Sequence, residues 1–115
     1  MNGTFTMAVC FKAKAQHSAE FGARLLDVVD VTRLDTGCIV FDVHQVQDDQ
    51  NAWYLYEGWR SKEDSDTHMR KPVIQAFFAE WDRLLMEAPV PLMLDLKSRR
   101  SSPASSWPAP LDSQP

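Results

Sequence analysis

The sequence predicts an α+β domain with a ferredoxin-like β-α-β-β-α-β order, in which helices cover one face of a four-stranded antiparallel sheet. Three observations lead to this fold class. Four stretches alternate in polarity or are rich in β-branched and aromatic residues, as strands are. Two helical regions with one apolar side separate them. The chain has 115 residues, which is enough for one domain and too few for two.

The first strand is expected from Thr4 to Ala15, with a richly apolar face made by Phe5, Met7, Val9, Phe11 and Ala13. A helix should follow, with Ser18 as its N-cap and Glu20 favourably placed in its first turn. Its apolar stripe is Phe21, Leu25, Val28 or Val29, and Thr32. The helix should end near LDTG, where Gly37 can adopt a left-handed conformation.

The second strand is expected at Cys38–Val46, the QDDQN segment supplies a turn, and the third strand spans Ala52–Arg60. A short helix should run from about Lys62 to Met69, and Pro72 suits the first turn of the next helix. The buried stripe of that helix would be Ile74, Phe77 or Phe78, Trp81, Leu84 and Leu85. The last strand is expected at Pro89–Lys97, with Val90, Leu92, Leu94 and Leu96 on one face and Pro91 placing it at an edge.

Composition narrows the class of protein. The chain is 44% hydrophobic and carries a net charge of −4, which argues against a nucleic-acid partner or an anionic membrane surface. No run approaches the ~20 apolar residues of a membrane span, and the N-terminus alternates like a strand instead of resembling a signal peptide. Cys10 and Cys38 are too few for a disulfide framework and fall in strand-like runs. We therefore expect reduced core thiols in a cytoplasmic protein.

Two domain-level expectations follow. Residues 1–97 should form the folded domain, and residues 98–115 a Ser/Pro-rich tail that cannot bury enough surface to order itself, with Trp107 and Leu111 as possible anchors on a partner surface. Helices cover only one face of the sheet, while several strands also place apolar residues on the other. A second copy of the chain is the natural cover, which predicts a two-fold homodimer.

The third strand carries the most unusual pattern. Period 2 places Trp53, Leu55, Glu57 and Trp59 on one face, so a carboxylate lies among large apolar side chains. Glu57 could sit at a strand end or dimer seam, paired with an arginine or with backbone donors, or it could orient a polar group of a pocket or the loop that follows. His68, in the helix that follows, could be a surface or capping group or a functional one.

The motifs of several chemistries are missing from the sequence. Three separated histidines lack metal-ligand spacing, and there is no phosphate loop, dinucleotide fingerprint or nucleophile elbow. We therefore expect no metal and no cofactor. The pocket that remains is aromatic and mostly apolar, which suits a flat organic molecule.

The segment from Thr36 to Phe77 resembles the antibiotic biosynthesis monooxygenase family of dimeric α+β barrels. The resemblance is carried by Gly37-Cys38, by Glu57-x-Trp59 with Ser61, and by His68 before a helix containing Phe77, and it extends from Phe5 to about Leu96. It implies the fold predicted above. Members include cofactor-free oxidases of anthrones and quinols, haem-degrading enzymes, an isomerase of a phosphorylated signal, and proteins of no known activity.

The resemblance carries over only in part at individual positions. Anthrone oxidases use a tryptophan that Trp59 matches, but Leu55 and Ser65 stand where they have an asparagine and a tyrosine. Haem-degrading members have a tryptophan and a histidine where His68 and Phe78 stand, which disfavours that activity. The three residues Glu57, Trp59 and His68 agree best with the quinol-oxidising and isomerase-like members.

Three functions remain open. The leading hypothesis is oxygenation of a small aromatic or quinol-like substrate by O₂, with His68 as base, Trp59 as a stacking wall and Glu57 orienting the site; Phe41, Trp53 and Phe77 are the candidate substrate-binding walls. The second is an isomerase or lyase of a small, possibly phosphorylated metabolite, which would need Arg60, Arg70 and Lys71 at the pocket. The third is a non-catalytic ligand-binding domain in which Glu57 and His68 are structural.

Overall fold

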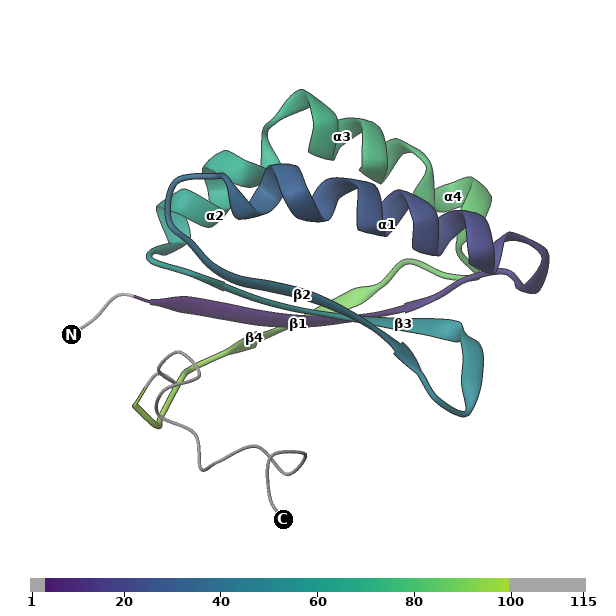
Figure 1. Ribbon diagram of the computed structural model, residues 1–115, viewed down its shortest axis with the longest axis horizontal. Helices are drawn as coiled ribbons and strands as arrows, with labels where there is room; N and C mark the ends of the chain where they lie inside the picture. Colours follow the sequence, from purple (N-terminus) through teal and green to yellow (C-terminus); the bar gives the residue numbers. More distant parts are fainter. Residues whose placement is uncertain (1–3, 100–115) are drawn as a thin grey trace, which may run out of the picture.

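The computed structural model describes residues 4–99, and within them it has the predicted element order (Figure 1). The predicted second strand and the first short helix have the expected bounds, whereas the third strand is longer and the last one shorter than predicted. The elements in chain order are β1 (Phe5–Lys12), a 3₁₀ turn η1 (Ala15–His17), α1 (Ser18–Arg33), β2 (Cys38–Val46), β3 (Asp49–Trp59), α2 (Lys62–Met69), α3 (Pro72–Ala79), α4 (Trp81–Leu84) and β4 (Val90–Leu94).

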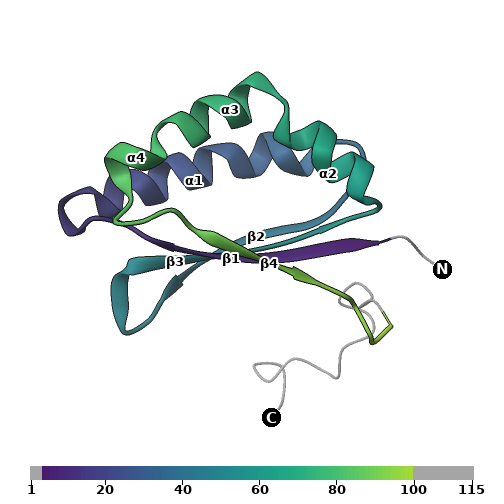
Figure 2. The ribbon, with the colours of Figure 1, turned by 180° about the vertical axis from the view of Figure 1, so that it is seen from behind.

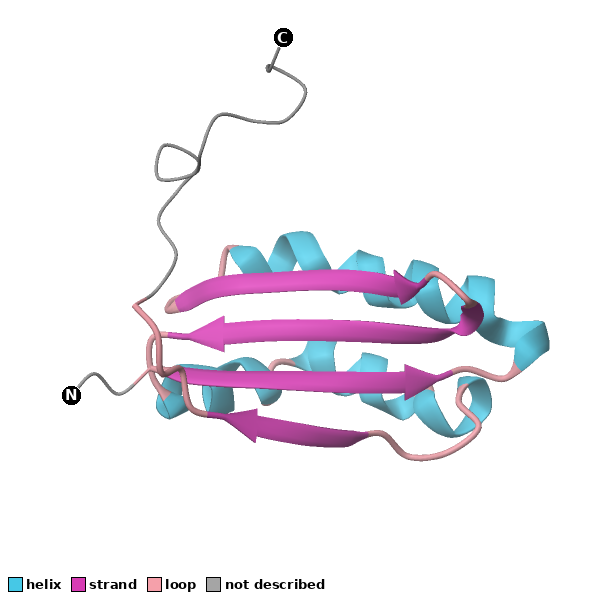
Figure 3. Ribbon diagram, turned by 90° about the horizontal axis from the view of Figure 1, so that it is seen from below, coloured by secondary structure: helices cyan, strands magenta, loops and turns pink. Residues whose placement is uncertain are grey.

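The four strands form one antiparallel sheet in the order β2-β3-β1-β4 (Figure 3). The predicted edge position of the last strand is confirmed, because among the described strands β4 pairs with β1 alone, and Pro91 lies in it. The register places Glu57 opposite Met7 on one neighbouring strand and opposite Phe41 on the other. These three side chains therefore share the face that the helices cover.

The helices lie on one face of the sheet and enclose the core between the two layers (Figures 1 and 2). The predicted apolar face of β1 and the predicted stripe of α1 are both confirmed, since Met7, Val9, Phe11 and Ala13 pack with Phe21, Leu25, Val28 and Val29 in one buried cluster. Gly37 has a φ of 83°, which confirms the left-handed turn between α1 and β2.

Two local predictions were wrong. Ser18 is the first residue of α1 and not its N-cap, because its hydroxyl donates to the backbone oxygen of Gln50 (2.6 Å) and accepts from Trp53 Nε1 (3.1 Å). The predicted long helix after Pro72 is two helices, α3 and α4, joined at Glu80. Glu80 keeps right-handed helical angles (φ −87°, ψ −11°), so the apolar spacing continues across the break and did not reveal it.

The other face of the sheet is not covered by any helix among residues 4–99 (Figure 2). Three side chains of β4 point to that face and are largely exposed: Val90 (75%), Leu92 (55%) and Leu94 (40%). Cys10 and Cys38 are free thiols, and burial raises the pKa of Cys38. Within the described part of the chain, no helix is both long and apolar enough to cross a membrane. The tail anchors predicted at Trp107 and Leu111 lie outside the described residues.

Candidate active site

A cavity of about 240 Å³ lies between the sheet and the helices. Its volume is slightly below the ~300–1,000 Å³ typical of small-molecule sites. Its lining is apolar or aromatic apart from two ionisable side chains, Glu57 and His68. The lining residues are Met7, Val9, Phe11, Leu25, Val28, Phe41, Leu55, Glu57, His68, Met69, Ile74, Phe77, Phe78, Trp81, Pro89 and Pro91.

Glu57 brings a carboxyl group into this apolar wall from the middle strand β3. Its side chain is 3% exposed, and its described hydrogen bond comes from Trp59 Nε1, which donates to Oε1 over 2.8 Å. Burial raises the pKa of Glu57 to about 7, although the hydrogen bond from Trp59 opposes the shift. At neutral pH this carboxyl group therefore exists in both protonation states, and it can accept or release a proton.

The pairing that the sequence allowed for Glu57, with an arginine or with backbone donors, is not what the structure shows. The partner of Glu57 is the indole of Trp59 on the same strand face. Two residues of a strand that lie two positions apart point the same way, which is why the indole can reach the carboxylate. No cation among residues 4–99 pairs with Glu57, so the buried carboxylate has little to favour its charged form.

His68 reaches the same cavity from α2. This helix begins after Ser61, whose hydroxyl accepts from the backbone N–H of Asp64 (3.1 Å) as an N-cap. The imidazole of His68 is 5% exposed, and its Nδ1 lies 3.1 Å from Oδ2 of Asp35. Burial lowers the pKa of His68, and the nearby Asp35 carboxylate only partly opposes this shift. His68 is therefore neutral at physiological pH.

Asp35 lies in the turn between α1 and β2, and its side chain is 10% exposed. Burial raises the pKa of its carboxyl group, but hydrogen bonds from Lys71 and His68 outweigh burial, so the net pKa is lowered. Lys71, at the N-cap of α3, donates to Oδ1 of Asp35, while His68 contacts Oδ2. The carboxylate therefore links the end of α1 to the junction of α2 and α3.

Trp59 lies behind the cavity wall and does not line it. It is fully buried, its ring centroid is 4.8 Å from that of His68, and its Nε1 holds Glu57. The structure therefore places Trp59 where it supports both ionisable residues. The sequence-based hypothesis made Trp59 a wall that stacks on the substrate, but the structure places its indole outside the cavity lining.

Of the three residues predicted as substrate-binding walls, two line the cavity and one does not. Phe41 and Phe77 line the cavity, whereas Trp53 does not. The indole of Trp53 packs against Gly22 and donates to Ser18, so it closes the contact between β3 and the start of α1. Among the positions where the family resemblance was incomplete, Leu55 and Phe78 are in the cavity wall, whereas Ser65 is buried outside the cavity lining.

The cations required by the isomerase hypothesis lie outside the cavity. Arg60 pairs with Asp64, Arg70 donates to Thr67, and Lys71 donates to Asp35. A phosphorylated ligand would find no arginine or lysine among the described lining residues. In residues 4–99, no three His, Cys, Asp or Glu side chains lie close enough together to hold a metal ion.

Sequence reasoning missed Asp35. It stands in LDTG, a segment that reads as turn chemistry, and 33 residues separate it from His68. The available signal was an aspartate two residues before Gly37, in the turn that leads into β2, the strand next to β3. That signal predicts a turn and does not predict the partner of the side chain.

Comparisons with known proteins show which family this chain belongs to. The sequence profile of the antibiotic biosynthesis monooxygenase family matches residues 4–80, which include Asp35, Glu57, Trp59 and His68. The chain belongs to the antibiotic biosynthesis monooxygenase family. The predicted ferredoxin-like fold and the family resemblance are thereby confirmed.

Solved structures of the same fold include PA3566 from Pseudomonas aeruginosa, with a TM-score of 0.80 and 22% identity over 85% of this chain and 98% of that one. Rv0793 from Mycobacterium tuberculosis has a TM-score of 0.80 and 21% identity over 85% of this chain and 99% of that one. A curated relative, the uncharacterized protein sll1783 of Synechocystis, is 26% identical over 64% of this chain. The matched segment spans 50% of that relative's length.

Proposed function

We propose that this member of the family is a monooxygenase that oxidises a small, neutral aromatic or quinol-like substrate with O₂. The observation that carries the proposal is the apolar cavity with two buried ionisable side chains, Glu57 and His68, in its wall. A flat substrate of this class fills apolar space and needs a base for its hydroxyl proton. The family membership supports the same class of reaction.

In this proposal His68 is the base. Because its Nδ1 faces Asp35, the neutral ring has Nε2 left to accept the proton of a phenol or enol. Glu57, whose pKa of about 7 allows either state, accepts or returns a proton as the substrate changes. Phe41 and Phe77 provide apolar contacts for the ring, and Trp59 holds Glu57 in place.

The electrons come from the substrate. The deprotonated quinol passes electrons to O₂, one oxygen atom bonds to a ring carbon, and the second leaves as water with two hydrogens of the substrate. The net change is quinol plus O₂ to hydroxyquinone plus water, which balances without a separate reductant. The cavity contributes by holding the phenolate away from bulk water and in contact with fixed groups.

The test is O₂ consumption with a panel of quinols, including menadiol, and anthrones, and with the uncatalysed oxidation of each substrate subtracted. We expect uptake with at least one substrate, and we expect isotopically labelled oxygen from O₂ to appear in the organic product. His68→Ala should lose most of the rate. The proposal fails if no substrate gives enzyme-dependent uptake, or if the rate of His68→Ala equals that of the wild type.

We propose further that the protein acts as a homodimer whose second copy covers the open face of the sheet. The exposed apolar side chains of β4 supply the contact surface, because a contiguous patch of apolar side chains is costly to leave in water. Leu92 on this face and Leu26 on the outer side of α1 are both 55% exposed, so they form a matched pair.

Sedimentation of the wild type should give the mass of a dimer. Leu92→Glu should give a monomer, and Leu26→Glu should remain a dimer. A monomeric wild type, or a dimer that Leu92→Glu does not weaken, would contradict this assembly.

A further inference from the structure

Asp35 has no part in the proposed reaction and does not line the cavity. Its side chain nevertheless contacts His68, which does line the cavity. Its two carboxylate oxygens face two different partners, with Oδ2 near Nδ1 of His68 and Oδ1 accepting from Lys71. Both Asp35 and His68 are nearly inaccessible to water, at 10% and 5% exposed, so solvent competes little for the contact.

The geometry restricts where the imidazole carries its proton. An ionised carboxylate only accepts hydrogen bonds, so a neutral His68 must place its proton on Nδ1 to bond with Asp35. Its Nε2 then has a free lone pair. No described residue makes a hydrogen bond to Nε2, and His68 is part of the cavity wall.

Lys71 controls the charge of the carboxylate. Its ammonium group is 44% exposed and donates to Asp35 from the N-cap of α3. A buried carboxylate beside an imidazole would otherwise be easier to protonate, and a protonated Asp35 could donate to Nδ1 instead of accepting from it. The lysine therefore favours the acceptor state of Asp35.

We propose that Asp35 is a positioning residue that fixes the proton of His68 on Nδ1 and so presents the Nε2 lone pair to the cavity, and that Lys71 further favours the ionised state of Asp35. Among the described residues, the charged groups that act on the imidazole are Asp35 from the α1–β2 turn and Lys71 from the α2–α3 junction, and Glu57 from β3 lines the same cavity. Asp35 acts only through His68, because it does not border the cavity itself.

The Asp35→Asn variant should carry the imidazole proton of His68 on the other ring nitrogen. Asparagine has one oxygen and one NH₂ group where aspartate has two equivalent oxygens. Lys71 donates only, so the amide oxygen must turn to Lys71 and the amide NH₂ must turn to His68. Nδ1 then has to accept, the imidazole proton moves to Nε2, and the cavity meets an N–H in place of a lone pair.

The experiment is ¹⁵N NMR of the histidine side chains in the full-length protein without substrate, at a pH where His68 is neutral. His68→Gln identifies the resonances. We expect Nδ1–H in the wild type, Nε2–H in Asp35→Asn, and Nδ1–H in Asp42→Asn, a matched control whose aspartate pairs with Arg33 on the surface. Lys71→Met should keep Nδ1–H at this pH, because Asp35 is still ionised there. An NMR titration of the Asp35 carboxyl group in this variant should show a higher pKa than in the wild type, because the hydrogen bond from Lys71 lowers that pKa.

The inference rests on the proposed role of His68 as base, but the readout needs no activity, so the two can fail separately. A wild type with the proton on Nε2, or an Asp35→Asn variant that keeps Nδ1–H, would overturn it even if the enzyme oxidises quinols. If Asp35→Asn does not fold, the wild-type tautomer and the Lys71→Met titration still decide. A Lys71→Met variant whose Asp35 carboxyl group has an unchanged or lower pKa contradicts the role proposed for Lys71.

Discussion

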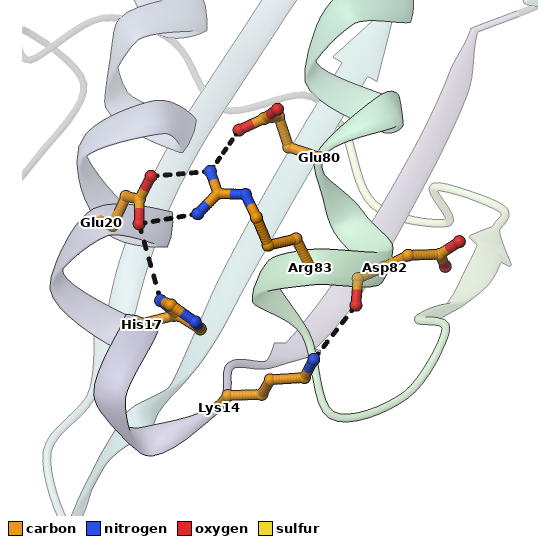
Figure 4. Close-up of polar contacts among 6 residues, drawn as sticks. All are labelled: Lys14, His17, Glu20, Glu80, Asp82 and Arg83. Carbon is orange, nitrogen blue, oxygen red and sulfur yellow. Dashed lines mark hydrogen bonds and ion pairs between the residues drawn. The ribbon is translucent and has the colours of Figure 1, made fainter.

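The two ends of the helical layer hold charged clusters of similar composition and very different surroundings. Near the end of α1, His68, Asp35 and Lys71 form one cluster. Near its start, Arg83 donates to both oxygens of Glu20 (3.1 and 2.7 Å) and to Glu80 (2.5 Å), and His17 lies 3.6 Å from Glu20 (Figure 4). Each cluster joins α1 to the helices that follow β3.

Exposure separates the two clusters. The side chains of Arg83 and Glu20 are 47% and 38% exposed, whereas those of His68 and Asp35 are 5% and 10% exposed. The hydrogen bond from Arg83 lowers the pKa of Glu20 and keeps it charged, while burial without a cation raises the pKa of Glu57 to about 7. Pairing keeps a carboxylate charged at both ends, Glu20 at the start of α1 and Asp35 at its end. Only at the buried end does burial also favour the neutral forms of His68 and Glu57, so that protons can be transferred there.

The largest expected difference between the two ends is in activity. His68→Gln should lower kcat/KM for a quinol substrate by roughly 10²–10⁴-fold, the usual contribution of a positioned base. His17→Gln, at the other end, should leave kcat/KM unchanged, because His17 contacts Glu20 and lies outside the cavity lining. Oxygen-electrode rates of both variants decide the point, and equal losses would show that the clusters do not differ in this way.

The second largest effect that we expect is a dependence of stability on pH, caused by Glu57. The pKa of Glu57 is higher in the folded state than the ordinary 4.5, so the folded protein binds the proton more tightly. Stability from this group is therefore greatest below pH 4.5 and falls as the pH rises towards 7, by about 3 kcal/mol in total. Glu57→Gln removes this loss, and it should be more stable than the wild type at pH 8 and similar to it at pH 4.

Urea unfolding at both pH values measures the effect of Glu57→Gln. Glu20→Gln is the control and should have the opposite sign, because a lowered carboxyl pKa adds stability above the ordinary pKa and loses it as the pH falls. A Glu57→Gln variant that is destabilised equally at both pH values would contradict the assignment of Glu57 as a buried proton-binding group.

Two glycines offer a smaller and more local comparison. Gly37 has a φ of 83°, and a Cβ there would lie 2.1 Å from Oδ2 of Asp64, so Gly37→Ala should cost about 1–3 kcal/mol. It should also change the His68 tautomer or pKa, since Gly37 is two residues from Asp35. Gly22→Ala would place its Cβ 2.3 Å from the Trp53 ring and should cost stability without any change at His68.

Urea unfolding and histidine NMR of both glycine variants test this difference. An unperturbed His68 in Gly37→Ala would show that the turn does not set the position of Asp35.

The smallest expected effect is that of Arg83→Met. This removes three hydrogen bonds of the exposed cluster, which salt and water already weaken. We expect a decrease in Tm smaller than that of either glycine variant, and one that shrinks as salt is added. A larger, salt-independent decrease would mean that this cluster is as important to the fold as the buried one.

The sequence predicted the fold through its periodicities, because the alternation of β1 and β3 and the stripe of α1 directly reflect which side chains are buried. It also singled out Glu57 and His68, whose residue types are unusual in an apolar context. It could not predict Asp35 or the true place of Trp59 and Trp53. Those places depend on contacts between distant segments: Asp35 with His68, Trp53 with Ser18 and Gly22 of α1, and Trp59 with His68 of α2. No local pattern encodes such contacts.

The most direct test of the central claim is an NMR titration that follows the side-chain carboxyl groups of Glu57 and Glu20 in one sample. We expect Glu57 to titrate near pH 7 and Glu20 below its ordinary 4.5, with His68 below its ordinary 6.5. If Glu57 titrates at or below 4.5, like Glu20, then burial does not make this end of the cavity a proton-transfer site, and the account is wrong.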